Sequence, residues 1–385
     1  MIQEIKEGPI HAPSARVIQA RGGSTLMPGL IDAHVHVNAS GLDLARVART
    51  PQSYLAHWAA AFLAGTLDRG FTTVRDVGGA DAGLAAALRD GLLPGPRLFY
   101  GGRVISQTGG HGDFRPGDLD LDHIPCGCAG HCDGFSVIAD GVDAVRKAVR
   151  EECRRGAAHI KIMASGGVSS PTDPLERCQY SDDEIAAAVD EATRAGIYVA
   201  AHCHPAEAIR RAAQLGVRTI EHGTLIDAET ARIVAETGAF VVPTLAIIAA
   251  LDSEGEAMGF PPPMMAKLRM LTGAVLEGLQ TMRSAGVQMG FGTDLLGELQ
   301  DRQSSEFLLR AQVLPAIDIL RSATSINARL LGQEGRLGCL APGAVADILL
   351  VAGDPLGDIS LLARPETALV TIVQGGRIHR MREPD

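Results

Sequence analysis

A regular alternation of strand-like and helix-like segments runs from residue 29 to residue 331. Amphipathic stretches with helical spacing occur at residues 54–69, 143–155, 181–195 and 205–215, and residues 181–184 have the form of a helix-capping box. Eight short apolar stretches between such helices are typical of buried strands, at residues 30–37, 72–77, 97–102, 159–163, 197–202, 219–222, 240–243 and 288–292. Eight such pairs, without a glycine-rich phosphate motif after the first strand, predict an α/β fold with a distorted (β/α)8 TIM barrel.

The two ends of the chain have a different pattern. Residues 340–351 and 368–376 have the composition of β-strands separated by turns, and the first residues, through 17–20, resemble strand material. We expect residues 1–26 and 336–385 to form a small β-sandwich beside a barrel of residues 27–335. Since only 26 residues precede Met27, this sandwich is expected to lack N-terminal strands and to expose a sheet edge, which favours association into a homo-oligomer.

Charge and composition exclude several classes of partner. The 385 residues carry a formal net charge of −10 without a concentrated basic stripe, which argues against nucleic acid and anionic membranes. Apolar runs such as residues 240–251 fall short of the roughly 20 residues of a membrane span, and residues 1–7 lack the apolar centre of a secretory signal. Seven cysteines without a regular framework predict reduced thiols in the cytoplasm. A small-molecule substrate fits these observations best.

Six side chains with metal-binding chemistry stand at or near the ends of predicted strands. In the first of these strands, residues two apart point to the same face, so both imidazoles of the run at residues 34–36 can meet one cation. In a barrel, the carboxyl ends of different strands converge on one pocket. The side chains are those of His34, His36, Lys161, His202, His222 and Asp294. Together they predict a two-metal site.

Lys161 needs an explanation, because an ammonium group repels cations. Its apolar neighbours Ile160, Ile162 and Met163 favour a desolvated and neutral amine. A neutral amine reacts with carbon dioxide to give a carbamate, an anion with two oxygens that can bridge two metals. The alternative is a barrel lysine that pairs with a carboxylate.

Several motifs are similar to those of the amidohydrolase superfamily, within it the metal-dependent dipeptidases and carboxypeptidases of the prolidase-like and imidazolonepropionase-like branch. The motifs extend over nearly the whole chain, at residues 27–36 (MPGLIDAHVH), 72–76 (TTVRD), 108–113 (TGGHGD), 165–168 (SGGV), 220–223 (IEHG), 292–294 (GTD), 323–328 (ATSINA) and 342–347 (PGAVAD). The resemblance implies a TIM barrel that carries a metal-dependent hydrolase.

The resemblance also implies roles for the six side chains. His34, His36, Asp294 and the carbamate of Lys161 would hold one divalent metal, and the carbamate, His202 and His222 would hold the other. A hydroxide between the two metals would attack the scissile carbonyl, and Asp294 would carry its proton to the leaving amine. Zinc suits the histidine-rich set, while manganese, cobalt or iron remain alternatives.

Substrate contacts are expected from two further histidines. By the resemblance, His111 binds the α-carboxylate of the substrate, with a loop-stabilising hydrogen bond as the alternative. His204 stands where relatives commonly have an aromatic hydroxyl, and it can contact a carboxylate by charge or by hydrogen bond. Three arginines could pair with a carboxylate, or form outward salt bridges instead: Arg75, Arg103 and Arg177.

Two long connections are expected between the predicted strands. Residues 104–139 lack periodicity and are expected to cover the active site, and residues 253–265 contain three consecutive prolines. The first connection carries thiols and imidazoles whose spacing matches no common zinc module, at Cys126, Cys128, Cys132, His123 and His131. Loop thiols without a metal are favoured there over a structural zinc site.

The sequence thus predicts a binuclear metal-dependent hydrolase that cleaves an amide bond in dipeptides or N-acyl amino acids with a free carboxylate. A cyclic-amide hydrolase of the imidazolonepropionase type is the alternative enzyme, although mononuclear members of that type do not need the lysine. A non-catalytic scaffold with the same fold is the third interpretation, and the presence of all six side chains argues against it.

Overall fold

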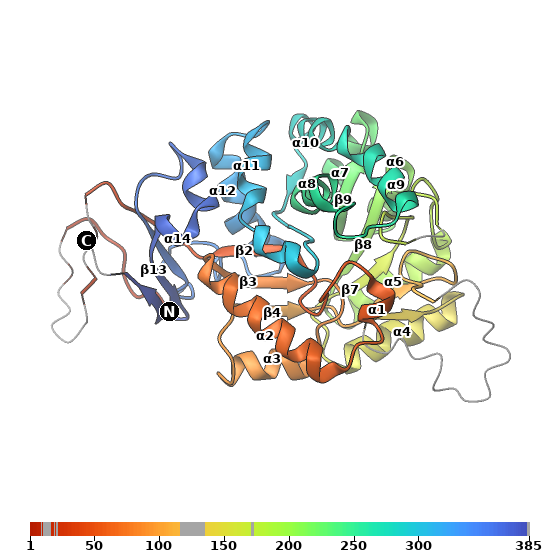
Figure 1. Ribbon diagram of the computed structural model, residues 1–385, viewed down its shortest axis with the longest axis horizontal. Helices are drawn as coiled ribbons and strands as arrows, with labels where there is room; N and C mark the ends of the chain where they lie inside the picture. Colours follow the sequence, from red (N-terminus) through yellow and green to blue (C-terminus); the bar gives the residue numbers. More distant parts are fainter. Residues whose placement is uncertain are drawn as a thin grey trace.

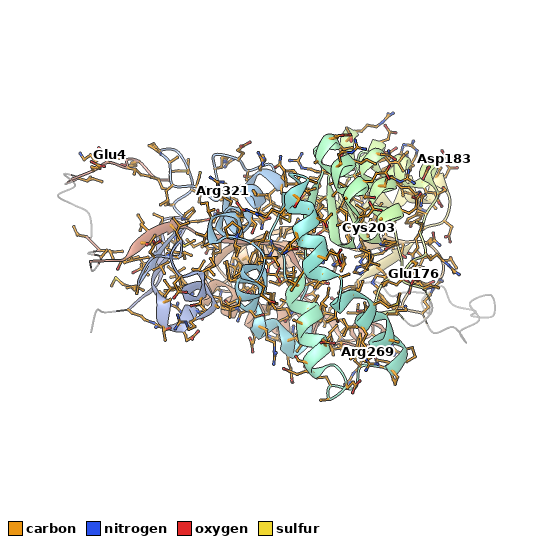
Figure 2. All side chains as sticks on the ribbon, turned by 90° about the horizontal axis from the view of Figure 1, so that it is seen from above. Glu4, Glu176, Asp183, Cys203, Arg269 and Arg321 are labelled. Carbon is orange, nitrogen blue, oxygen red and sulfur yellow. The ribbon has the colours of Figure 1, made fainter. Side chains whose placement is uncertain are left out.

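The computed structural model describes residues 1–8, 10, 17–18, 20, 22–115, 135–170 and 173–382. The cysteines and histidines of residues 123–132 lie outside these residues. Among the described helices, none combines the length and the apolar character that a bilayer span requires. In the view from above, Glu4 and the small sheet lie at one end of the molecule, and Glu176 and Asp183 lie at the other (Figure 2).

Parallel strands form the body of the molecule, as predicted (Figure 1). One section of the sheet has the order β2-β3-β4 and the other has the order β11-β10-β9-β8-β7-β5-β6. The barrel strands are β2 (Leu30–Val35), β3 (Phe71–Asp76), β4 (Arg97–Tyr100), β5 (Val104–Ser106), β6 (Ser136–Ile138), β7 (Ile160–Met163), β8 (Val199–Pro205), β9 (Thr219–Leu225), β10 (Phe240–Val242) and β11 (Gln288–Met289). The expected third strand at residues 97–102 is thus broken at Gly101 and Gly102, and β5 continues it.

Backbone hydrogen bonds at two seams close the barrel. Ala33 N donates to Phe291 O at 2.8 Å, and Ala158 N donates to Tyr100 O at 2.8 Å. The fully buried amide of Asn327 clasps the first seam, since its Nδ2 donates to Ile31 O at 2.7 Å and to Phe291 O at 2.9 Å. The motif at residues 323–328 therefore stabilises the barrel rather than the site directly.

Helices surround the sheet, and the four predicted helical stretches are confirmed with small shifts of their ends. The helices are α1 (Leu44–Val47), α2 (Gln52–Asp68), α3 (Ala82–Arg89), α4 (Val142–Arg154), α5 (Asp182–Arg194), α6 (Ala206–Gln214), α7 (Ala228–Thr237), α8 (Leu245–Glu254), α9 (Pro262–Thr272), α10 (Val275–Ser284), α11 (Ser305–Ala311), α12 (Ala316–Arg321), α13 (Asn327–Leu330) and α14 (Pro365–Ala368). The predicted capping box forms at the start of α5, where Ser181 and Glu184 exchange hydrogen bonds. The described residues also contain short 3-10 segments at Gly297–Arg302 and Ile359–Ala363 and a π-helical turn at Ser322–Ile326.

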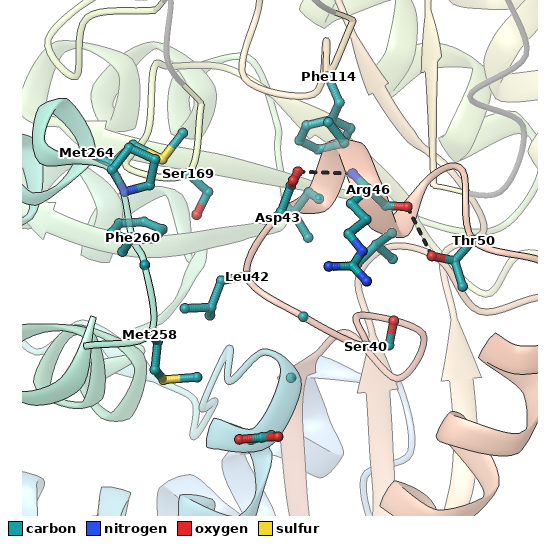
Figure 3. Close-up of a pocket in the computed structure, with 18 of the residues that line it drawn as sticks. Ser40, Leu42, Asp43, Arg46, Thr50, Phe114, Ser169, Met258, Phe260 and Met264 are labelled. Atoms are coloured by element: carbon teal, nitrogen blue, oxygen red, sulfur yellow. Dashed lines mark hydrogen bonds between the residues drawn. The ribbon is translucent and has the colours of Figure 1, made fainter. Parts of the chain in front are cut away.

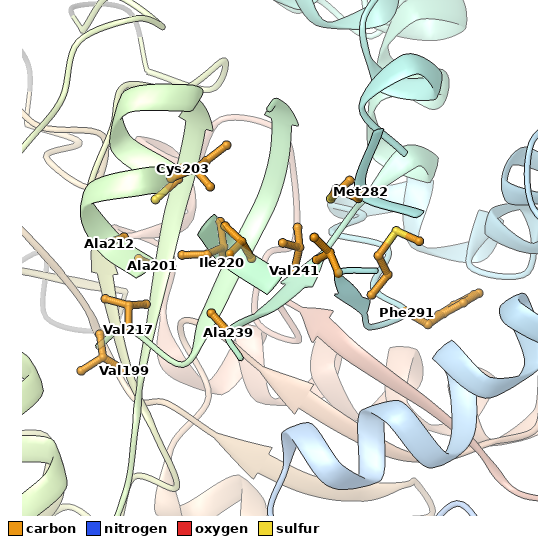
Figure 4. Packing of buried hydrophobic residues seen from close by; sticks show 14 of the residues in the cluster. Val199, Ala201, Cys203, Ala212, Val217, Ile220, Ala239, Val241, Met282 and Phe291 are labelled. Carbon is orange, nitrogen blue, oxygen red and sulfur yellow. The ribbon is translucent and has the colours of Figure 1, made fainter. Parts of the chain in front are cut away.

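Alternation along the strands separates the core from the pocket. On β8, Val199, Ala201 and Cys203 pack outward into the hydrophobic core under the helices, next to Ile220 of β9 (Figure 4). The intervening side chains of β8 consequently face the inside of the barrel.

The expected long connections are shorter than predicted. Residues 104–139 contain β5 and β6, of which β6 adds to the edge of the sheet next to β5. At residues 253–265, α8 continues to Glu254 and α9 begins at Pro262. Prolines suit this position, because the first turn of a helix has no intrahelical partner for its N–H groups.

The small domain is a four-stranded antiparallel sheet with the order β1-β12-β13-β14. Its strands are β1 (Thr25–Pro28), β12 (Ile348–Val351), β13 (Leu369–Gln374) and β14 (Arg377–Met381), so both ends of the chain contribute, as expected. The strand expected through residues 17–20 is wrong for the described residues 17, 18 and 20, where Val17 is 82% exposed and forms no ladder. The described residues therefore show one layer, and no second sheet of a sandwich.

Candidate metal centre

The structure brings all six predicted ligands to one pocket at the carboxyl ends of the barrel strands. This inner pocket has a volume of about 70 Å³, and His111 and His204 line it as well. Lys161 comes from β7, His202 and His204 come from β8, and Asp294 follows β11. Residues that are up to 260 positions apart in sequence (Asp294 minus His34) thus meet in space.

The first group of ligands consists of His34, His36 and Asp294. Asp294 Oδ1 lies 3.3 Å from His34 Nε2 and 3.4 Å from His36 Nε2. The other nitrogen of each ring donates a hydrogen bond away from the pocket. His34 Nδ1 donates to Glu221 Oε2 at 2.7 Å, and His36 Nδ1 donates to Gly78 O at 2.9 Å. These bonds fix the tautomers, so both Nε2 lone pairs face the same point, as metal ligands require.

A fully buried ion pair supports this first group from below. Arg75 Nη2 donates to both carboxylate oxygens of Glu221 at 2.8 Å, and Arg75 Nη1 donates to Thr219 Oγ1 at 2.9 Å. Although burial opposes it, the charges of Arg75 and His34 hold the pKa of Glu221 well below its usual range. Glu221 is therefore an ionised carboxylate that accepts the hydrogen bond of His34 Nδ1.

The second group consists of His202, His204 and His222. Candidate ligand atoms of the three rings lie within 4.8 Å of one another. His202 Nε2 donates to Gly166 O at 3.1 Å, and His222 Nδ1 lies 2.8 Å from Thr244 Oγ1. The geometry thus groups His204, which was predicted as a substrate contact, with the two predicted ligands.

Lys161 lines the same inner pocket as both groups, with 1% of its surface exposed. Burial lowers the pKa of its amine to about 8, against the opposing charges of Glu221 and Asp294. Within the described part of the chain, no carboxylate forms a hydrogen bond or salt bridge with the amine, although Glu221 and Asp294 act on it electrostatically. A desolvated amine without a partner is suited to carbamate formation.

Burial also keeps most of the imidazoles neutral, which is the form that binds metals. It lowers the pKa of His36 to about 4 and that of His204 to about 3, and it lowers the pKa of His202 and His222 strongly. His34 differs: burial acts to lower its pKa, but Asp294 and Glu221 together raise it. The pocket is thus electrostatically divided, with its negative charge on the side of His34.

Two of the site residues have a strained backbone. Among the described residues, three non-glycine residues have positive φ: Tyr180, His222 at 69° and Asp294 at 57°. Because strict alternation would place neighbours on opposite faces of β9, this turn at His222 lets both Glu221 and His222 point into the barrel. Such strain persists where the surrounding structure fixes it, and it concentrates at functional sites.

A larger cleft opens onto the inner pocket. It has a volume of about 1250 Å³ and shares Leu44, Phe114 and Ser169 with the inner pocket. Met258, Phe260 and Met264 form one wall, and Arg46 extends into the space from the opposite side (Figure 3). Most of a substrate that reached the metal centre would therefore lie in this cleft.

Other predicted contacts lie elsewhere. Arg75 is inside the barrel, neither in the pocket nor in an outward salt bridge. Arg103 pairs with Glu152 at 2.7 Å, and Arg177 is on the surface. Sequence reasoning missed Glu221 and Thr244 as supports of the histidines; the position of Glu221 beside His222 was the available signal.

The family model for the amidohydrolase family matches residues 25–378. The chain belongs to the amidohydrolase family. This amidohydrolase is similar to a prolidase solved with N-methylphosphonate-L-proline, with 47% identity, a TM-score of 0.95 and coverage of 99% of this chain and 92% of the other. It is similar to a Xaa-Pro dipeptidase solved with bound methionine, with 31% identity, a TM-score of 0.86 and coverage of 98% and 92%.

A third relative is the ochratoxinase of Aspergillus niger. It is 32% identical over 373 residues, which are 92% of this chain and 75% of the relative. Its crystal structure gives a TM-score of 0.80 over 92% of this chain and 83% of the other. The predicted superfamily, its dipeptidase branch and the barrel with a small β-domain are confirmed by these similarities.

Proposed function

We propose that this amidohydrolase is a binuclear metal-dependent enzyme that hydrolyses the amide bond of dipeptides or N-acyl amino acids with a free carboxylate. The observation that carries the proposal is the convergence of two ligand groups and the buried Lys161 on one pocket. The named relatives, a prolidase and a Xaa-Pro dipeptidase, make a C-terminal proline the first candidate for the released residue.

The donor set fits two divalent ions. His34, His36 and Asp294 would hold one ion, and His202 and His222, with His204 beside them, would hold the other. Imidazole-rich sets favour zinc. Two such ions supply an acidified water and a polarised carbonyl when they are bound.

Lys161 is proposed to become a carbamate. Its Nζ lone pair forms a bond to the carbon of carbon dioxide, one N–H proton leaves to solvent, and the negative charge is shared by two oxygens. Since no hydrogen bond or salt bridge to a described residue occupies Nζ, the amine is available for this bond. The carbamate would bring one negative charge, shared by two oxygens, into the pocket that both ligand groups line.

Asp294 is proposed to move the proton. Although burial opposes it, His34 and His36 lower the pKa of its carboxyl, so the group is an acceptor at neutral pH. Oδ1 faces the first group and Oδ2 lies 3.8 Å from His222 Nδ1, so the carboxylate stands between both groups. Asp294 would accept the proton of the attacking water and donate it to the leaving nitrogen, which allows the C–N bond to break.

The two pockets suggest where the substrate lies. His111 lines the inner pocket, where it would contact the α-carboxylate of the released amino acid. The acyl side would then extend into the outer cleft, whose lining includes Leu42, Phe260 and Met264. A cyclic amide would use little of this cleft, which is a second reason, besides Lys161, to favour open-chain substrates.

Metal analysis and a substrate screen test the proposal. We expect about two equivalents of transition metal per chain after reconstitution, and hydrolysis of N-acyl-L-proline or Xaa-L-proline within a library of dipeptides and N-acyl amino acids. Release of the free amino acid is the measurement. A folded protein that binds no metal, or that hydrolyses only cyclic amides, would contradict the proposal.

A further inference from the structure

The segment that follows β7 forms one side of the inner pocket. Val168 and Ser169 line the pocket, and Gly166 O accepts the hydrogen bond of His202. Gly167 packs against the ring of His111 so closely that a Cβ there would lie 2.3 Å from His111 Cε1. The segment therefore contacts both a proposed ligand and the proposed substrate contact.

Asp173 is the buried anchor of this segment, with 1% of its surface exposed. Its Oδ2 accepts hydrogen bonds from Gly167 N at 3.1 Å and Gln179 Nε2 at 3.1 Å. Its Oδ1 accepts the hydroxyl proton of Ser170. The carboxylate thus accepts hydrogen bonds from one backbone N–H and from two side chains.

This arrangement determines which nitrogen of His111 carries a proton. Ser170 Oγ has a single proton, which it gives to Asp173, so the oxygen can only accept from His111 Nδ1 at 2.8 Å. Asp173 Oδ2, at 3.4 Å from the same nitrogen, also requires a proton there. His111 Nδ1 is therefore the donor, and Nε2 is the nitrogen left for the pocket.

The ring of His111 is fixed on its other sides too. It stacks on His202 with centroids 4.3 Å apart, and its backbone N–H donates to Gln179 Oε1 at 2.9 Å. Gln179 Nε2 also donates to Asp173 Oδ2, so the side chain of Gln179 holds both His111 and Asp173 in place. Among the described residues, none forms a hydrogen bond with His111 Nε2.

We propose that Asp173, acting through Ser170, is a positioning residue that fixes the proton on His111 Nδ1 and directs Nε2 toward the carboxylate of the substrate. This inference rests on the proposed function of the site. Asp173 thereby holds the ring of His111 in one orientation, as the carboxylate of a hydrolytic triad does for its histidine.

Lys267 of α9 holds the same segment from outside. Its Nζ donates to Gly167 O at 3.0 Å, to Ser170 O at 2.7 Å and to Asp173 O, and it lies 3.7 Å from Asp173 Oδ1. Met264, one turn earlier on α9, lines the outer cleft. Among the described residues, the Lys267 ammonium and the His111 imidazole are the cationic or titratable groups that face the Asp173 carboxylate. The hydrogen bonds of Lys267 also hold the backbone of the segment in place.

The experiment is a double-mutant comparison of zinc-reconstituted enzyme. Asp173→Asn and Ser170→Ala are each made alone and together with His111→Ala. Asp227→Asn is the matched control, because it removes the charge of the exposed N-cap of α7 and keeps the capping oxygen. For Asp173→Asn we expect a rise in KM of about tenfold for N-acyl-L-proline, with a smaller change in kcat and unchanged zinc content. In the His111→Ala background the same change should have no further effect, and the carboxamide analogue of the substrate should not distinguish Asp173→Asn from the unaltered enzyme.

A readout that does not depend on turnover keeps the proposal testable if no substrate is found or if one variant misfolds. In ¹⁵N-histidine spectra of the zinc protein, the His111 signal, identified by its loss in His111→Ala, should show a protonated Nδ1 that exchanges slowly with solvent. Exchange should become fast in Asp173→Asn and Ser170→Ala, and should stay slow in Asp227→Asn.

The outcomes separate the two proposals. Hydrolysis by the unaltered enzyme, with KM unaffected in Asp173→Asn or with additive effects of the double variant, would overturn the positioning role alone. A proton found on Nε2 instead of Nδ1 would overturn it as well. No hydrolysis of any acyl amino acid, with the Nδ1 proton in place, would overturn the proposed function and keep the assigned tautomer.

Discussion

The two ligand groups of the pocket differ in charge. In the first group, the Asp294 carboxylate lies 3.3 Å and 3.4 Å from two imidazoles, and the Glu221 carboxylate lies 2.7 Å behind one of them. The second group has three imidazoles, supported by hydroxyl and carbonyl oxygens. Among the described residues that line the inner pocket, Asp294 is the only acid.

This difference bears on the proposed role of Lys161 in a pocket for two metals. Two divalent ions would bring four positive charges into a desolvated pocket, where uncompensated charge is costly. Asp294 offsets one of them, and Glu221 is already neutralised by Arg75. An ammonium on Lys161 would add to the excess, whereas a carbamate would subtract from it. Conversion of the ammonium to the carbamate, with loss of two protons to solvent, changes the local charge by two.

Removal of Lys161 should have the largest effect. We expect Lys161→Ala to lose turnover by about a thousandfold or more, since a preorganised electrostatic group is removed, and to bind about one metal per chain instead of two. Small carboxylic acids should restore part of the activity by supplying the missing oxygens. Metal content and the rate of amide hydrolysis are the measurements.

The exposed Lys147→Ala variant of α4 is the control for loss of a lysine. If Lys161→Ala retains both metals and normal activity, the bridging role is wrong, and the second group does not need an anion from Lys161.

Asp294→Asn tests the anionic side of the comparison. Asparagine accepts the positive φ of this position as readily as aspartate does, so the fold should persist. The amide has no basic oxygen for a proton, and we expect kcat to fall by about a hundredfold to a thousandfold, while metal remains bound. Metal analysis beside steady-state kinetics checks this, and unaltered kcat would rule out proton transfer by Asp294.

The sequence was sufficient to bring the six proposed ligands to one pocket, because their placement follows from simple periodicity. His34 and His36 are two positions apart, and the predicted strands place their ends in one layer of a barrel. Glu221 could not be assigned this way, since the positive φ of His222 breaks the alternation of β9.

Other features depend on packing that no local pattern contains. Three such features result from tertiary contacts: the break of the third strand at residues 101–102, the single layer of the small sheet, and the contacts of Lys267 with Gly167, Ser170 and Asp173. The predicted long connection at residues 253–265 is wrong for a local reason, because the consecutive prolines there begin α9.

The supports of the two groups should differ in energy. Glu221→Gln leaves Arg75 buried without its counterion, and we expect a loss of about 3–5 kcal/mol in the free energy of unfolding. Thr244→Val, the matched change behind His222, removes a neutral hydrogen bond and should cost about 1 kcal/mol. Denaturant unfolding of the metal-free proteins measures both.

The pH dependence gives the sign of the Glu221 contribution. The pKa of Glu221 is lower in the folded protein than its ordinary value of 4.5. Its stabilisation is therefore fully present above that pH and decreases as the pH falls below it. Glu221→Gln should reduce this acid sensitivity. If Glu221→Gln and Thr244→Val lose equal free energy of unfolding at pH 7, the supports of the two ligand groups do not differ.

His204 provides the finest test of the comparison, because the sequence and the structure suggest different roles for it. If it is the third imidazole of the second group, His204→Ala should weaken the binding of one metal by about 10–100-fold, with the other metal unaffected. If it contacts the substrate, KM should rise while both metals stay bound. Zinc competition with a chelator, measured beside KM, distinguishes the two results. Since His204 adds no negative charge, either result leaves the second group dependent on Lys161 for an anion.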